Sequence, residues 1–186
     1  MRNNDRGFTL VELIVSIALL GIIAVAAAGF LVTGTRTYTS VNYSVRLQYE
    51  TQLAMNQIQD YVMNCSQGIA WEGSTLYIVN SDNSLQEISL KGDQKLYYVG
   101  NKMAASDSGS ITPNDLMAEN VTAFGVTFSP APTEQNKTTT ATAATVTLTM
   151  ERGGKSYTGT QTIALRNKPL AANSWSNLWM GLNPTP

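Results

Sequence analysis

The apolar residues of this chain are concentrated near its N-terminal end. Residues 8–33 form an apolar run of about 26 residues that contains one charged side chain, Glu12. Because a helix rises about 1.5 Å per residue, a run of this length crosses a bilayer core of about 30 Å. Arg2 and Arg6 precede the run, and their positive charge favours retention of residues 1–7 in the cytoplasm. The pattern predicts a single membrane-spanning helix with its N-terminus inside.

Beyond Gly34 the sequence becomes polar but keeps the spacing of an amphipathic helix. Two sets of apolar positions recur at helical intervals and fall on roughly opposite faces. The first set is Tyr43, Leu47, Ala54, Ile58, Tyr61 and Cys65, and the second set is Tyr38, Val41, Val45, Tyr49 and Leu53. No proline interrupts this region, and Gly68 offers a stop signal. We therefore expect one helix from Phe8 to about Ser66, roughly 90 Å long.

Two apolar faces on one helix need two covering surfaces. The first set reaches the end of the helix, so we expect the protein's own sheet to cover it. The second set has no evident partner within the chain, so we expect it to stay more exposed and to pack on neighbouring subunits. The alternative is a single broad apolar face with exposed tyrosines. The residues expected beneath the sheet are Leu47, Ala54, Ile58 and Tyr61.

From residue 68 onward, apolar and polar residues alternate in short runs, which is typical of strands. The expected strands cover residues 75–80, 84–90, 95–99, 121–129, 143–151 and 156–166. Gly153 and Gly154 separate the last two runs, and a Gly-Gly pair is a strong hairpin signal. A long helix followed by antiparallel hairpins predicts an α+β fold, in which the helix packs on an antiparallel β-sheet.

Three segments of the C-terminal part lack a clear strand pattern. Residues 104–114 are rich in Ser, Asp and Gly, and residues 130–144 are rich in Thr and Ala, so both are expected to be solvated loops, the second of them mobile. The tail, residues 170–186, contains Trp175 and Trp179. We expect this tail to dock on the domain because exposed tryptophans are a liability. A contact surface for a partner is the alternative.

The composition excludes several classes of function. Charged residues make up 13% of the chain and the net charge is −1, without any run of Lys or Arg, so no nucleic-acid surface is evident. The chain has no histidine, which removes the commonest general base. Cys65 is the single cysteine and is expected to be a small buried apolar residue. Asp82 and Asn83 are expected to form a turn. We predict no enzyme activity, no cofactor and no metal site.

The residues around the start of the apolar run admit two interpretations. An ordinary secretory signal is cleaved after its apolar segment. Here the distinctive residues, Gly7 and Phe8, come before that segment, and Glu12 lies within it. The chain is either an uncleaved signal anchor with a stray glutamate, or it carries a leader that is removed after Gly7. A carboxylate in an apolar span is costly and indicates a functional partner. Cleavage would create an ammonium group at Phe8 that such a carboxylate on an adjacent copy could bind.

The string GFTLVEL, residues 7–13, resembles the processing motif of prepilins. This resemblance implies that a prepilin peptidase cleaves after Gly7 and methylates the amine of Phe8, and that Glu12 acts between subunits during assembly. It also implies a pilin fold. The corresponding divisions are a leader at residues 1–7, a transmembrane and assembly helix at 8–34, an amphipathic half of the same helix at 35–67, and a β domain with a C-terminal tail at 68–186.

The order of three later segments resembles W-type minor pilins and J-type minor pseudopilins of type II secretion. The segments are residues 52–69, 116–128 and 163–167. This resemblance implies a minor pilin or pseudopilin, a structural subunit that helps to initiate or cap a type IV pilus or a secretion pseudopilus. The alternatives are the major repeating subunit and a tip-located pilin that binds a surface or a secreted substrate.

The same resemblance implies partners and a location. The partners are other pilins or pseudopilins, the prepilin peptidase and the assembly platform in the cytoplasmic membrane. The subunit is expected in the cytoplasmic membrane before assembly, with a single pass. After assembly it is expected in a filament at the cell surface or in the periplasm.

Overall fold

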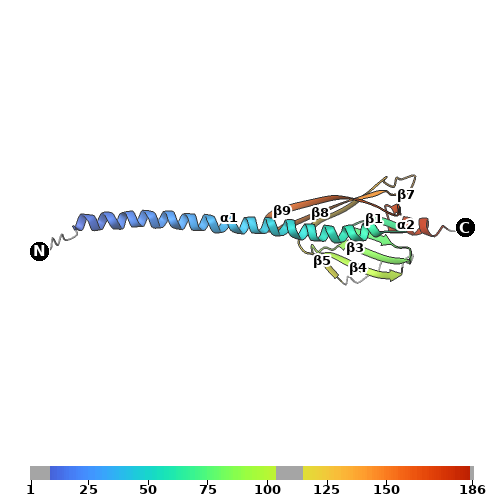
Figure 1. Cartoon of the computed structure of the whole chain (residues 1–186), viewed down its shortest axis with the longest axis horizontal. Coiled ribbons are helices and arrows are strands. Elements are labelled where there is room, and N and C mark those ends of the chain that lie inside the picture. The colour runs from blue at the N-terminus through green and yellow to red at the C-terminus, as the bar shows by residue number, and fades with distance from the viewer. Residues whose placement is uncertain (1–8, 104–114, 185–186) are drawn as a thin grey trace. The chain divides into compact units, whose positions relative to one another are not determined.

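The computed structural model describes residues 9–103 and 115–184 (Figure 1). The chain divides into two parts, residues 1–42 and residues 43–186, and each part is described by itself. The helix α1 (Leu10–Asn64) contributes to both parts. The second part contains the strands, which form two sheets, and a short C-terminal helix, α2 (Trp175–Leu182).

Helix α1 ends at Asn64, slightly before the predicted end. The expectation that Gly68 stops the helix is wrong, because Gly68 is the first residue of strand β1 (Gly68–Glu72). The chain leaves the helix earlier because the amide of Gln67 donates to the carbonyl of Val79, a bond to a neighbouring strand, at 3.0 Å. The exit from α1 is therefore fixed by the sheet and not by a glycine.

The larger sheet has seven strands in the order β5-β4-β3-β2-β1-β10-β7. Its other members are β2 (Thr75–Val79), β3 (Ser84–Leu90), β4 (Leu96–Met103), β5 (Asp115–Ala118), β7 (Thr138–Thr140) and β10 (Leu170–Ala172). All neighbours are antiparallel except β1 and β10, which pair in parallel. The α+β prediction is confirmed, with two sheets and one parallel pair where a single antiparallel sheet was expected.

The smaller sheet has three strands in the order β6-β8-β9. They are β6 (Val121–Ser129), β8 (Ala143–Arg152) and β9 (Lys155–Ala164). The predicted hairpin between the last two strands is confirmed. Gly153 and Gly154 have φ angles of 59° and 71°, in the left-handed region that a tight hairpin turn of this kind requires and glycine adopts without strain.

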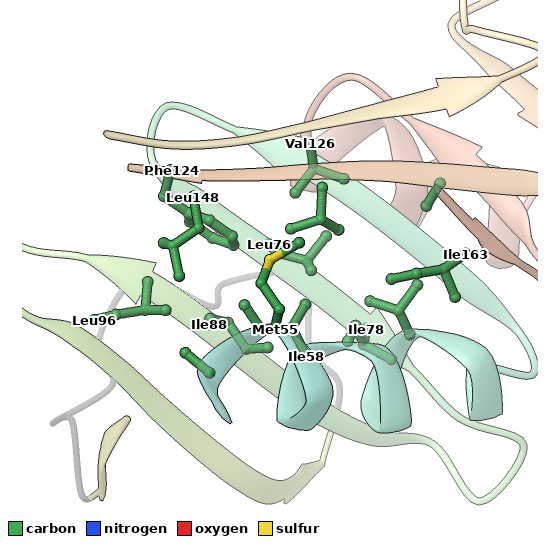
Figure 2. Packing of buried hydrophobic residues seen from close by; sticks show 14 of the residues in the cluster. Met55, Ile58, Leu76, Ile78, Ile88, Leu96, Phe124, Val126, Leu148 and Ile163 are labelled. Atoms are coloured by element: carbon green, nitrogen blue, oxygen red, sulfur yellow. The ribbon is translucent and has the colours of Figure 1, made fainter. Parts of the chain in front are cut away.

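The main core lies between the second half of α1 and both sheets. Figure 2 shows Met55 and Ile58 of α1 beside residues from the two sheets, among them Leu76 and Leu148. The buried residues of α1 are Leu47, Thr51, Ala54, Met55, Ile58 and Val62. Three of the four residues predicted to lie beneath the sheet are thus buried. The fourth, Tyr61, is half-buried, and its ring stacks on that of Tyr98 with the centroids 4.4 Å apart.

The second apolar set of α1 remains exposed, as predicted. The exposed fractions are 56% for Val45, 69% for Tyr49 and 48% for Leu53. Tyr38 and Val41, in the other part of the chain, are also exposed. The single-face alternative is therefore excluded within residues 43–64, where one apolar set is buried and the other faces outward.

The C-terminal tail docks on the domain, which confirms the first of its two interpretations. Strand β1 presents Ile69 to the main core and Ala70 to a second apolar cluster formed with α2. Trp175 and Leu178 of α2 are buried in this second cluster. A Cβ atom at Gly68 would lie 2.7 Å from Cδ1 of Leu178, so any other residue there would force this leucine side chain to shift.

The expectation of a mobile linker at residues 130–144 is wrong in part. Residues 138–140 form β7 and pair with β10, and Ala141 is fully buried. The Thr-rich composition suits an edge strand as well as a loop, because Thr is β-branched. The other expected loop, residues 104–114, lies outside the described residues.

Candidate processing and assembly site

The predicted processing residues, Gly7 and Phe8, lie outside the described part of the chain. The description begins at Thr9, directly after them, and Glu12 lies in the first turn of α1. This places Glu12 where a carboxylate meets the free amides of a helix N-terminus.

Thr9 and Glu12 bind each other reciprocally at this helix start. The amide and the hydroxyl of Thr9 donate to Oε2 of Glu12 at 3.1 and 3.0 Å. The amide of Glu12 donates to Oγ1 of Thr9 at 3.2 Å. This arrangement is a capping box, in which the first and fourth residues satisfy each other's backbone donors. The spacing Thr-x-x-Glu is a sequence signal for it, and the sequence analysis missed this role of Glu12.

The capping box leaves part of the Glu12 carboxylate available. Both bonds from Thr9 end on Oε2, and no group within residues 9–103 and 115–184 donates to Oε1. The side chain is exposed. Oε2 of Glu12 therefore caps the start of its own helix, while Oε1 can accept a hydrogen bond from another molecule.

The surface of α1 that follows Glu12 is apolar and uncovered. Within the described residues, α1 is the one helix long and apolar enough to cross a membrane, and none of its apolar window is buried. A helix that is apolar on every side requires lipid or other helices around it. The exposed large apolar residues of this segment include Leu13, Leu20, Ile23, Phe30 and Leu31.

Residues 2–28 match the family model for the prokaryotic N-terminal methylation motif. The chain is type IV pilin-like. The match covers the leader, Gly7, Phe8, Glu12 and most of the apolar run, and it does not reach the domain. No curated protein matches the chain. The pilin-like motif implies processing by prepilin peptidase and assembly with other pilins, and it fits membrane anchoring and display on a pilus surface. Proteins with this motif are structural subunits.

Within residues 43–186, the exposed apolar set of α1 meets a further exposed apolar residue. Leu53 of α1 and Leu116 of β5 are each about half exposed and line one small cleft of about 180 Å³. The same cleft is bordered by an ion pair between Glu50 and Arg152, with the charged atoms 3.8 Å apart. The exposed apolar set of α1 thus ends beside β5 in a cleft of mixed lining that carries both signs of charge. The sequence analysis found Leu53 but not Leu116.

The structure places Cys65 among buried apolar residues, as predicted. Its thiol donates to the carbonyl of Gly68 at 3.1 Å. Burial raises the pKa of the Cys65 thiol from 9.0 to about 12. A thiol that stays protonated at neutral pH is a poor nucleophile. Cys65 is a packing residue.

Asp82 and Asn83 of the β2–β3 turn have structural roles. Oδ1 of Asp82 accepts a bond from the amide of Ser84 at 2.9 Å, and bonds from Ser84 lower the pKa of the Asp82 carboxyl. Asn83 has a φ of 59°, which suits a turn. Within the described ranges there is no group of three or more His, Cys, Asp or Glu residues that could hold a metal ion.

Proposed function

We propose that the chain is a minor pilin or pseudopilin that is cleaved after Gly7, methylated at Phe8 and inserted into a filament through α1. The observation that carries this proposal is the methylation motif at residues 2–28 together with an apolar helix segment that no other described residue covers. In this role the subunit helps to initiate or cap a type IV pilus or a secretion pseudopilus, and it has no enzymatic activity.

The proposed parts of the subunit follow the chain. Residues 1–7 are the leader, residues 8–34 the membrane and assembly helix, and residues 35–67 its amphipathic half. Residues 68–186 are the β domain. The preference for a minor role over the repeating subunit rests on the order of the segments at residues 52–69, 116–128 and 163–167, which resembles minor pilins.

Glu12 is the proposed contact between subunits. Its Oε2 is engaged by Thr9, and its Oε1 is open to the Phe8 ammonium of a neighbouring subunit. Between packed helices water is scarce, so this pair is stronger there than in an isolated chain. An unpaired buried carboxylate would cost several kcal/mol, which favours partners that bring a cation.

The test is co-purification of the full-length chain with its partner pilins from cells that assemble the filament. Glu12→Gln keeps a capping side chain, because glutamine also serves at this position of a capping box, but it removes the charge. We expect Glu12→Gln to be cleaved normally and to lose most of its partners. The matched control is Thr9→Val, which weakens the cap and keeps the charge, and it should retain its partners.

Two outcomes contradict the proposal. Full recovery of partners with Glu12→Gln would show that the charge is not the assembly contact. An equal loss with Thr9→Val would assign Glu12 to helix capping alone. The number of copies per filament, counted in the same preparations, decides between the two structural roles. A copy in every repeat would make the chain the major subunit.

A further inference from the structure

Strand β9 has a free edge. It is the outermost strand of the smaller sheet, and no described strand pairs with its outer side. The hairpin turn closes at the pair Arg152 and Lys155, and such a closing pair exchanges backbone hydrogen bonds. Bonded pairs alternate along an antiparallel ladder, so every second residue of β9 turns its amide and carbonyl away from β8. These outward-facing residues are Ser156, Thr158, Thr160, Thr162 and Ala164.

This edge is long and lacks the usual protection. From Ser156 to Ala164 it extends about 27 Å at the usual rise of a strand. Edge strands are normally protected from pairing by proline, by charged side chains or by a bulge. Residues 156–164 contain no proline and no charged residue. The pairing of β8 with β9 runs without a register shift. The edge is therefore ready to accept another strand.

A groove runs beside this edge, between β9 and the second half of α1. Its volume is about 450 Å³, and it is lined by Thr51, Gln52 and Met55 of α1 and by residues 157–161. Every one of these side chains is uncharged. A helix alongside a free edge strand is an arrangement in which peptide-binding domains accept an extended segment. An added strand would bond to the outward-facing groups and place alternate side chains in the groove.

The two ends of strand β9 differ in the charged residues around them. Arg166 and Lys168 are exposed just beyond the C-terminal end of β9, and neither forms an ion pair within the described residues. At the hairpin tip, by contrast, Glu151 lies beside the basic residues Arg152 and Lys155. Strand β9 thus has an uncharged edge that is followed in the chain by two basic residues. Its charge complements a segment that is neutral in its centre and acidic at one end.

We propose that β9 and α1 form a strand-addition site for an extended segment of a partner protein, uncharged over at least five residues and acidic at the end beside Arg166 and Lys168. Backbone bonds to β9 give the affinity, and the groove and the basic end give the selectivity. A second copy of β9 fits less well, because antiparallel pairing would bring Lys155 of one copy toward Arg166 of the other. The inference goes beyond the proposed function and does not depend on N-terminal processing.

The test uses the full-length chain in detergent micelles and two labelled peptides, with binding measured by fluorescence anisotropy. Both peptides alternate threonine and valine over seven residues, and they carry either glutamate or lysine at both ends. We expect saturable binding of the glutamate peptide, at least tenfold tighter than that of the lysine peptide. Arg166→Glu combined with Lys168→Glu should reverse this preference.

Variants at Thr160 separate the backbone from the side chain. Thr160→Pro removes an outward-facing amide and leaves the bonds to β8 in place, since proline is tolerated on the open side of an edge strand. It should abolish binding, whereas Thr160→Val should bind as the parent chain does. If Thr160→Pro lowers the melting temperature of the domain, Thr160→Lys replaces it, because a charge on the edge also blocks pairing.

Absence of saturable binding, or equal binding by the parent chain and both blocking variants, overturns the inference. Dimers of the parent chain that disappear in Thr160→Pro would assign the edge to a second copy and overturn the choice of partner. Neither result contradicts the proposed function, because cleavage after Gly7 is measured in a separate experiment. An unprocessed chain would still bind the peptide.

Discussion

The two halves of α1 have the same secondary structure and opposite surroundings. None of residues 10–42 is buried, whereas the segment from Tyr43 to Asn64 contributes six buried residues to the core of the domain. The first half is apolar on nearly every side from Leu10 to Val32, and the second half is apolar on two separate faces. One continuous helix can thus have an uncovered segment and a segment that packs in a domain core. The pattern of side chains, and not the backbone, decides which segment is covered.

The largest expected loss of unfolding free energy comes from a substitution in the buried half of α1. Ile58 is fully buried between α1 and the sheets, so Ile58→Ala should leave a cavity and destabilise the domain by about 2–5 kcal/mol. The measurement is denaturant unfolding of the full-length chain in detergent micelles, followed by tryptophan fluorescence, because the tryptophans lie in the domain. A loss below about 1 kcal/mol would show that the described core does not support the domain.

Much of this contrast is predictable from sequence. The inner face of α1 follows from the helical spacing of Leu47, Ala54 and Ile58, and the hairpin of β8 and β9 follows from strict alternation around two glycines. Strand β1 escaped prediction because it is buried on both faces and shows no alternation. Its parallel partner, β10, has three residues and is distant in the sequence, so no local pattern marks it.

The candidate site was predictable in part, for a different reason. Glu12 stands out because a carboxylate is costly in an apolar span. The roles of Gly7 and Phe8 stay predictions that rest on the resemblance of residues 7–13 to the prepilin motif. The capping box of Thr9 and Glu12 could also have been predicted from the sequence, because the spacing Thr-x-x-Glu is a signal for it. The cleft of Leu53 and Leu116 could not, because it depends on how β5 lies beside α1.

An intermediate effect on the stability of the domain is expected at high pH, and it comes from Cys65, directly after the end of α1. Burial raises the pKa of Cys65 to about 12, so the unfolded chain loses its thiol proton before the folded chain does. The stabilising contribution is complete below pH 9 and is lost as the pH rises toward 12. The slope is about 1.4 kcal/mol per pH unit within this window.

Unfolding at pH 8, 9 and 10 checks this expectation, with Cys65→Ala as the control. The control chain should lose less stability between pH 9 and pH 10 than the parent chain, since both share every other titrating group. Identical losses would show that the thiol is not held protonated by burial.

The smallest effects are expected on the exposed surfaces of the same helix. Ile22 is 67% exposed and Val45 is 56% exposed, so Ile22→Ala and Val45→Ala should each change the unfolding free energy of the domain by less than about 0.5 kcal/mol. Val45→Ala should instead weaken co-purification with partner pilins. If Val45→Ala destabilises the domain as much as Ile58→Ala does, the assignment of the two faces is wrong.

The central claim is that the first half of α1 becomes the N-terminus of a processed subunit. Intact-mass analysis of the protein extracted from membranes of cells with active prepilin peptidase tests this claim most directly. The account predicts a chain that begins at Phe8 and carries one methyl group on its amine, and a chain cleaved at no site when Gly7 is replaced by a bulky residue. A chain that still begins at Met1 in the presence of the active peptidase would contradict it.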